Sequence, residues 1–252
     1  MNNDIIIGIL QPSYLAWIPL FKRMIMSDIF IYLDDVKYSK NSFHNRNRIK
    51  TPQGSLTLTV PVQYKGNSSR SIQQMPINNS TNWKSKHWRA IELNYSKTIF
   101  FSQLSLVLKN NVYSQSWEYL ADLNIKIIEF FKDYLGITTK CYRSSELNIK
   151  SSGNEKLIDI CKYFNANKFI VKSGTEHYHP KEIFLEHNIE FEYFLNTPES
   201  YNQIYGDFIA DLSILDFAMN CGPNSFNGEG INYEDWQYRF IKRSHDYSRD
   251  RE

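Results

Sequence analysis

Cysteine is scarce in this sequence, and the few cysteines are scattered. The three cysteines of the 252-residue chain, Cys141, Cys161 and Cys221, lie far apart and form no C-x-x-C pair. A disulfide framework or a thiolate zinc site is therefore not expected, and reduced thiols suit a cytoplasmic protein. His177 and His179 match no usual zinc spacing either, so we predict no metal site at these histidines.

Long apolar runs and an excess of one charge are also missing. The first apolar run, Ile5 to Leu10, is too short to span a bilayer, and no cationic segment precedes it. The formal net charge is +2 and no long basic run occurs, so the sequence as a whole predicts no nucleic-acid partner. We expect a cytoplasmic protein without a membrane span.

The common signatures of nucleophilic and phosphate-binding sites are absent as well. No G-x-S-x-G, Walker or G-x-G-x-x-G pattern occurs in the sequence. Cys161 falls on the apolar side of a predicted helix, a position typical of a core residue rather than a nucleophile. Any chemistry must come from other combinations of residues.

The N-terminal stretch does carry a clear pattern of alternating elements. Ile5 to Leu10 is a short β-branched run, residues 14–26 have helical periodicity, and Ile29 to Leu33 is a second apolar run. Strand, helix and strand in this order predict a βαβ unit with buried, parallel strands. We therefore expect an α/β fold with a mostly parallel, Rossmann-like sheet.

The remaining chain continues this pattern around a helical stretch. Three helices are predicted over residues 83–97, 101–110 and 117–135, which makes an inserted helical subdomain plausible. Further predicted elements are strands at 57–62, 141–144, 168–171 and 189–195, and helices at 154–164 and 212–219. The predicted organisation is an α/β part at 1–80, a helical insertion at 81–137 and an α/β part at 138–252, together forming one compact unit.

Two adjacent carboxylates follow the second predicted strand. Asp34 and Asp35 stand at its carboxyl end, where open parallel sheets bind ligands, and adjacent strand residues point to opposite faces. One carboxylate could bind a sugar hydroxyl or amine, act as a base, or hold Mg²⁺ on a diphosphate. The alternative is that they cap the following turn.

A polar, cationic segment comes next. Arg46 and Arg48 share one side of an extended segment, beside Asn45 and Asn47, and could clamp the phosphates of a nucleotide. The alternative is an ion pair from either arginine back to Asp34 or Asp35. His44 directly precedes the group and is a candidate general base, with a surface histidine as the alternative.

The loop after the first strand supplies the other candidates. Gln11 could bind a polar group through two hydrogen bonds, and Tyr14 could stack on a ligand or donate a hydrogen bond to it. The alternative is a self-contained turn, with Pro12 fixing its entry. A ligand site is thus predicted where this loop, the two aspartates and residues 44–48 meet.

Several short motifs in a fixed order connect the chain to a known family. They are Gln11-Pro12-x-Tyr14, Asp34-Asp35-Val36, Asn45-Arg46-Asn47-Arg48-Ile49, Leu58-Thr59-Val60-Pro61, Trp83-Lys84-x-Lys86-His87, Asp159-Ile160-Cys161-Lys162 and Leu212-Ser213-Ile214-Leu215-Asp216. This combination resembles the WbqC-like family, whose genes tend to lie among those for bacterial surface polysaccharides. Ala16 departs from the pattern, since the family usually has proline before the aromatic residue.

The resemblance implies a setting, the biosynthesis of O-antigen or another surface polysaccharide. Our hypothesis within that setting is an enzyme that modifies a nucleotide-linked amino sugar by acyl or aminoacyl transfer to the amine. The candidate donors are thioesters, including one on an acyl-carrier protein. The alternative is a non-catalytic protein of the same pathway that binds a nucleotide sugar or serves as a scaffold.

Overall fold

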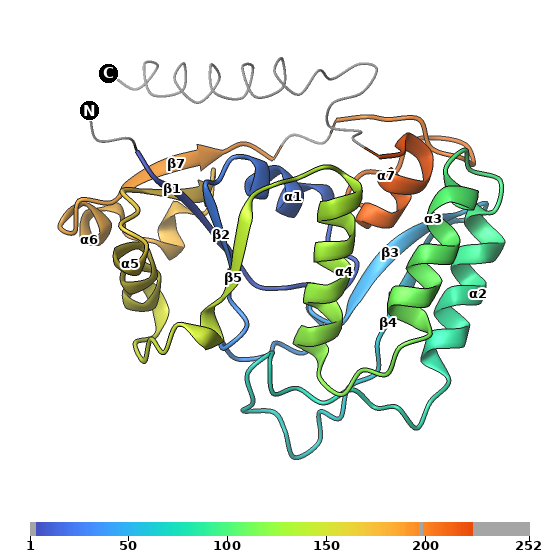
Figure 1. Cartoon of the computed structure of the whole chain (residues 1–252), viewed down its shortest axis with the longest axis horizontal. Helices are drawn as coiled ribbons and strands as arrows, with labels where there is room; N and C mark the ends of the chain where they lie inside the picture. Colours follow the sequence, from blue (N-terminus) through green and yellow to red (C-terminus); the bar gives the residue numbers. More distant parts are fainter. Residues whose placement is uncertain (1–3, 197–198, 224–252) are drawn as a thin grey trace.

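The computed structural model describes residues 4–196 and 199–223, and a five-stranded parallel sheet lies at its centre (Figure 1). The strand order is β5-β2-β1-β6-β7, with β1 paired to β2 on one side and to β6 on the other. The strands are β1 (Ile6–Leu10), β2 (Ile29–Tyr32), β5 (Lys140–Arg143), β6 (Lys168–Lys172) and β7 (Glu190–Phe194). The expected α/β fold with a mostly parallel, Rossmann-like sheet is confirmed.

The connections of this sheet reverse direction at β1. The chain passes from β1 outward to β2 and β5, and then crosses to β6 and β7 on the opposite side. Because all five strands are parallel, their carboxyl ends lie along one edge of the sheet. Ligands of open α/β sheets bind along this edge, so the loops after β1, β2, β5 and β6 are where a site is expected.

Helices cover both faces of the sheet because successive strand residues alternate between them. Phe30 and Tyr32 pack into one apolar core with α1 and α4, whereas Ile31 packs into the other core with α5 and α6. The helices are α1 (Ile18–Ile25), α2 (Trp83–Tyr95), α3 (Phe101–Leu108), α4 (Leu120–Tyr134), α5 (Gly153–Tyr163), α6 (Lys181–Leu185) and α7 (Ile214–Cys221). A π-helical turn at Lys109–Tyr113 extends α3, and 3-10 turns lie at Ser144–Glu146 and Glu176–Tyr178.

A separate β-hairpin lies beside the helices rather than in the sheet. Its strands, β3 (Arg46–Thr51) and β4 (Gly54–Thr59), pair antiparallel. Only the second of these was expected as a strand, because the sequence of β3 is too polar to show a clear alternation. Asn47 and Ile49 point inward and are buried, whereas Arg46 and Arg48 lie half-buried on the outer face.

The helical stretch between β4 and β5 is part of the main structure. Residues of α2, α3 and α4 share one apolar core with α1, α7 and strand β2, and Figure 1 shows these helices packed side by side to the right of the sheet. The division of the chain near residues 80 and 137 remains a prediction.

A buried polar network fixes the hairpin against this core. The Asp216 carboxylate of α7 accepts hydrogen bonds from the hydroxyls of Tyr95 (2.8 Å) and Tyr201 (2.7 Å). Tyr95 in turn accepts a hydrogen bond from the backbone N–H of Lys50 at 2.8 Å, and the buried Lys50 ammonium donates to Gln203 and to the carbonyl of Asp207. These contacts hold β3 in place and with it the segment that precedes it.

Candidate functional site

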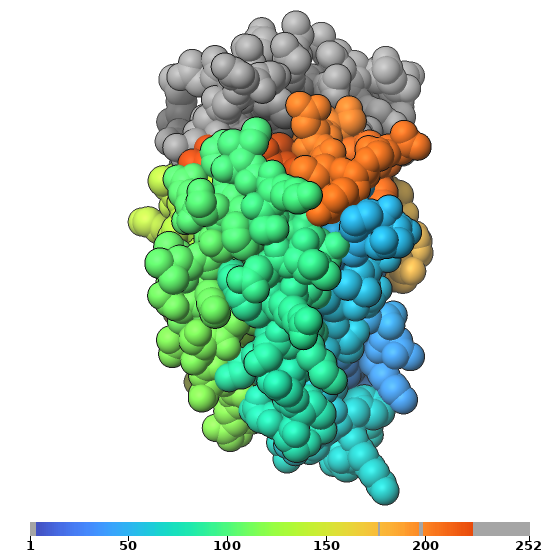
Figure 2. All heavy atoms as spheres, turned by 90° about the vertical axis from the view of Figure 1, so that its right-hand side faces the viewer, coloured from blue at the N-terminus to red at the C-terminus, as the bar shows by residue number. Residues whose placement is uncertain are grey.

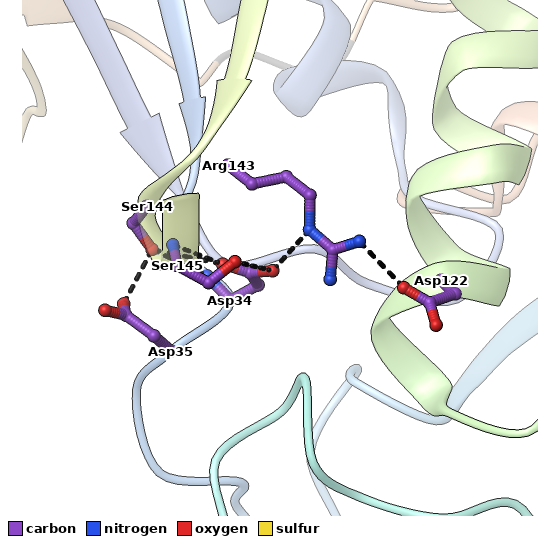
Figure 3. A network of polar contacts seen from close by, with 6 residues as sticks. All are labelled: Asp34, Asp35, Asp122, Arg143, Ser144 and Ser145. Carbon is purple, nitrogen blue, oxygen red and sulfur yellow. Dashed lines mark hydrogen bonds and ion pairs between the residues drawn. The ribbon is translucent and has the colours of Figure 1, made fainter. Parts of the chain in front are cut away.

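Asp34 is completely buried at the carboxyl end of β2 and is held by residues of β5 and the turn after it (Figure 3). Its Oδ2 accepts hydrogen bonds from Arg143 Nε at 2.7 Å and from the Ser145 hydroxyl at 3.0 Å. Its Oδ1 accepts one from the Ser145 backbone N–H at 3.0 Å. A carboxylate with this many donors and no exposed surface locks two strand ends together, which is a structural rather than a catalytic environment.

Arg143 extends this network to the helical side of the sheet. Its Nη1 lies 2.8 Å from an oxygen of Asp122 in the first turn of α4, so one guanidinium bridges two carboxylates. Figure 3 shows the third guanidinium nitrogen bonded to neither. The arginine partner of Asp34 is therefore Arg143, and neither Arg46 nor Arg48 forms an ion pair with Asp34 or Asp35 in the described part of the chain.

Asp35 shares the Ser144 hydroxyl with Asp34, but its charged partner lies on α5. Its Oδ2 lies 2.6 Å from the Lys156 ammonium, and its Oδ1 accepts a 2.6 Å hydrogen bond from the Ser144 hydroxyl. The two neighbouring aspartates thus serve opposite faces of the sheet, as expected for adjacent residues that leave a strand. Unlike Asp34, Asp35 keeps part of its side chain exposed, and this part faces a pocket.

A pocket of about 570 Å³ opens at the carboxyl ends of β2 and β5. Its lining carries Asp35 and three lysines, Lys37, Lys150 and Lys156, together with the serines and backbone around Ser152 at the start of α5. Lys156 pairs with Asp35, so the net positive charge of the lining comes from Lys37 and Lys150. The side chains of both lysines are exposed. The volume suits a small-molecule ligand, and the excess of positive charge favours an anionic one.

His44 is buried near the carboxyl end of β1 and both of its ring nitrogens are occupied. The backbone N–H of Ser39 donates to Nδ1 at 3.2 Å, so the proton resides on Nε2, which donates to the side-chain oxygen of Gln11 at 2.7 Å. Burial lowers the pKa of His44 to about 4. Because it is neutral and has no free acceptor, His44 positions Gln11, and this geometry does not support a role as general base.

The same burial predicts a pH dependence of stability. The pKa of His87 is also lowered by burial to about 4, whereas an unfolded histidine titrates near 6.5. The unfolded chain therefore takes up protons first as the pH falls from about 6.5 to about 4, and stability is lost over that interval. The stability difference between wild type and His87→Gln should shrink by about 2–3 kcal/mol between pH 7 and pH 4.5, measured by urea denaturation.

The exposed His187 provides the control for this experiment. His187→Gln should leave the pH dependence of the wild type unchanged, because this side chain lies outside the buried core that contains His87. An equal stability difference between wild type and His87→Gln at both pH values would contradict the assignment.

Tyr14 lies in the core rather than in a ligand site. Its hydroxyl is 2.8 Å from His87 Nδ1 and 2.9 Å from the Tyr113 hydroxyl, and its side chain is fully buried. Burial raises its pKa well above the ordinary value. Tyr14 therefore joins the loop after β1 to α2 and the π-helical turn, and it does not reach the surface.

The Asn45 to Arg48 segment divides into inward and outward residues. Asn45 donates to the carbonyl of Val60 at 2.7 Å and Asn47 to that of Leu15 at 2.8 Å, so both amides hold the hairpin in place. The guanidinium of Arg46 donates to the carbonyl of Asn41, and that of Arg48 to the carbonyl of Asp211. The two arginines lie on the hairpin, and the pocket lining does not include them.

The structure thus separates residues that the sequence placed in one site. Asp35 reaches the pocket, Gln11 and His44 form a pair at the end of β1, and Arg46 and Arg48 lie on the hairpin. Sequence reasoning missed Lys150 and Lys156. The Ser151-Ser152-Gly153 turn before a predicted helix was the available signal, because helix starts after a strand often bind anions.

Neither a metal-ligand cluster nor a membrane-spanning helix occurs in the described residues. Within residues 4–196 and 199–223, no three His, Cys, Asp or Glu side chains come together as metal ligands would. Over the same residues, every helix is too short or too polar to traverse a bilayer.

Fold and pocket define an α/β protein with a cationic pocket at the carboxyl edge of a parallel sheet. The chain belongs to the WbqC-like protein family, whose model matches residues 11–227. It is 32% identical over 220 residues to the uncharacterized protein Rv1507c of Mycobacterium tuberculosis (strain ATCC 25618 / H37Rv), an alignment that covers 87% of this chain and 95% of that protein. No solved structure matches the chain.

Proposed function

We propose that this protein is an enzyme that modifies a nucleotide-linked amino sugar by acyl or aminoacyl transfer to the sugar amine. The observation that carries this proposal is the pocket at the ends of β2 and β5, which combines cations with one accessible carboxylate. A nucleotide-linked amino sugar presents the matching groups, because its diphosphate is anionic and its amine is basic. The resemblance to the WbqC-like family supports a place in surface-polysaccharide biosynthesis.

The two ends of the ligand would meet different parts of the pocket. Lys37 and Lys150 lie exposed at the pocket and suit the diphosphate, and the serine-rich start of α5 adds backbone and hydroxyl donors. Asp35 suits the amine, whose nitrogen loses a proton as the amide bond forms. Lys156 and Ser144 each bind one oxygen of Asp35 and so fix its direction.

The reaction itself needs an activated donor, such as a thioester or another acyl carrier. The neutral amine attacks the donor carbonyl, the new C–N bond forms, and the bond to the carrier breaks. Asp35 accepts the proton that the amine releases. No nucleophilic serine or cysteine lies in the lining of this pocket with a histidine beside it, so direct attack fits these residues better than a covalent intermediate.

Ligand binding tests the first half of this proposal. Titration calorimetry with a nucleotide-linked amino sugar should show a single site in the wild type. Lys150→Ala should weaken binding by about 1.5–3 kcal/mol, the range for a hydrogen bond to a charged group. Lys162→Ala is the matched control, because Lys162 is exposed on α5, the helix that follows Lys150, and is outside the pocket lining.

The outcome also separates the two classes of function. Equal affinity in wild type and Lys150→Ala would place the ligand elsewhere. Normal binding with no turnover, across a panel of amino sugars and donors that includes a carrier protein, would favour the non-catalytic alternative of a nucleotide-sugar-binding or scaffold protein.

A further inference from the structure

The near-neutral charge of the whole chain hides a strong separation of charge. Residues 36–91 contain ten Lys or Arg residues and no Asp or Glu. The rest of the chain therefore holds 19 of the 29 basic residues and all 27 acidic ones, a net charge of −8. A local field of one sign governs what a surface attracts more than the total charge does.

The cations of this segment are available at the surface. Apart from the buried Lys50, they are exposed or half-buried: Lys37, Lys40, Arg46, Arg48, Lys65, Arg70, Lys84, Lys86 and Arg89. We call these nine residues the basic face. In the described part of the chain none of them pairs with a carboxylate, and those that make hydrogen bonds, such as Arg46 and Lys84, donate to backbone carbonyls.

Two segments that carry part of the basic face, around Lys37 and around Arg70, lie next to one another, and the first reaches the pocket. The backbone N–H of Tyr38 donates to the carbonyl of Arg70 at 3.0 Å, and that of Ile72 donates to the carbonyl of Val36 at 2.9 Å. Figure 2 shows the segments in blue to blue-green along the right flank and lower end of the molecule. Lys37 belongs both to this face and to the pocket lining.

Aromatic rings lie among these cations. Trp17 and Phe43 stack with their rings 6.0 Å apart and an angle of 9° between their planes, and 53% of Phe43 is exposed. The Lys40 ammonium lies 5.3 Å from the ring centre of Tyr64. Of these rings Phe43 is exposed, whereas Trp17 and Tyr64 are half-buried. Cations beside an accessible ring are a surface chemistry that binds single-stranded nucleic acid, through phosphates and a stacked base respectively.

We propose that the basic face binds RNA, with phosphates on its lysines and arginines and an unpaired base on Phe43. An anionic bilayer would also be attracted by the charge, but it offers no planar groups to stack on exposed rings. An acidic protein would need its charges fixed to match these loops, whereas a flexible RNA strand can follow cations that are spread over several segments.

An RNA bound here would supply a donor to the adjacent pocket, and this part rests on the proposed transfer reaction. An amino acid carried as an ester on a terminal ribose is an activated acyl group. The sugar amine would attack its carbonyl, the amide C–N bond would form and the ester C–O bond would break. The ribose oxygen would leave with the proton that Asp35 had taken from the amine.

Fluorescence anisotropy with a labelled, unstructured 20-nucleotide RNA and with bulk tRNA tests the proposal on the full chain. Four phosphate contacts predict that affinity for the single strand falls roughly 50-fold between 50 and 200 mM salt. Charge reversal of Lys40, Arg46, Lys65 and Arg70 to Glu should abolish binding and its salt dependence. Phe43→Ala should weaken binding by about 10- to 100-fold, the range for loss of one stacked base.

A matched variant and one further measurement, of binding to vesicles, complete the test. Reversal of Lys126, Lys140, Lys162 and Lys181, which are exposed but outside residues 36–91, should leave RNA binding unchanged. No RNA binding by the wild type at 50 mM salt, or equal losses in both reversal variants, would overturn the proposal. Tighter binding to phosphatidylglycerol vesicles than to RNA, lost in the same variant, would assign the face to a membrane instead.

The pocket and the basic face can fail independently. Asp35→Asn should bind RNA as the wild type does, and the variant reversed at Lys40, Arg46, Lys65 and Arg70 should bind the nucleotide-linked sugar normally. Loss of RNA binding with intact sugar binding leaves the proposed function in place, because these four residues are outside the pocket lining.

Discussion

Replacement of Asp35 by asparagine is expected to reduce turnover about 10²- to 10⁴-fold, the usual cost of removing a general base. The substitution keeps the shape of the side chain and its hydrogen bond from Ser144, but it removes the proton acceptor for the sugar amine. Affinity for the nucleotide-linked sugar should change far less, because the cations that face its diphosphate remain. Steady-state kinetics with an amino-sugar nucleotide and an activated donor measures both quantities.

Two other variants, Glu146→Gln and His44→Ala, are the controls for Asp35→Asn. Glu146→Gln removes an exposed carboxylate from the turn after β5, outside the pocket lining, and should leave turnover intact. His44→Ala should cost less than Asp35→Asn, since neither His44 nor its partner Gln11 lines the pocket. A fully active Asp35→Asn enzyme would remove this carboxylate from the mechanism, and a larger effect of His44→Ala would return the role of base to the histidine.

Asp34→Ala is expected to lower the free energy of unfolding by about 3–5 kcal/mol, because it leaves a buried network without its central carboxylate. The Ser145 backbone N–H and hydroxyl lose their acceptor, and Arg143 keeps only Asp122. Chemical denaturation of the purified variant measures the effect. The substitution should act on stability rather than on ligand contacts, since Asp34 is outside the pocket lining.

Asp122 provides the control within the same network. It contacts the same guanidinium but its side chain is 44% exposed, so Asp122→Ala should cost no more than about 1 kcal/mol. An Asp34→Ala protein that is as stable as the wild type but inactive would show that Asp34 takes part in the chemistry after all.

The sequence alone determined the order and type of nearly all elements and the family. Short β-branched runs and helical periodicities are local signals, so β1, β2, β6, α1 and α5 could be predicted from their own residues. The position of Asp34 and Asp35 at a strand end, on opposite faces, followed from the same reasoning. The strand β3 was missed because Arg46 to Arg48 shows no apolar alternation, and its inward residues are asparagines.

Only the tertiary structure decided which of these residues share a site. Asp34 pairs with Arg143 and Asp35 with Lys156, partners more than 100 positions away in the chain. No local pattern specifies such pairs, because they depend on how β5 and α5 pack beside β2. The protonation of His44 was likewise decided by burial. The uneven distribution of charge along the chain is visible in the sequence. Whether these cations lie on one surface depends on the packing that places residues 36–44 beside residues 62–74.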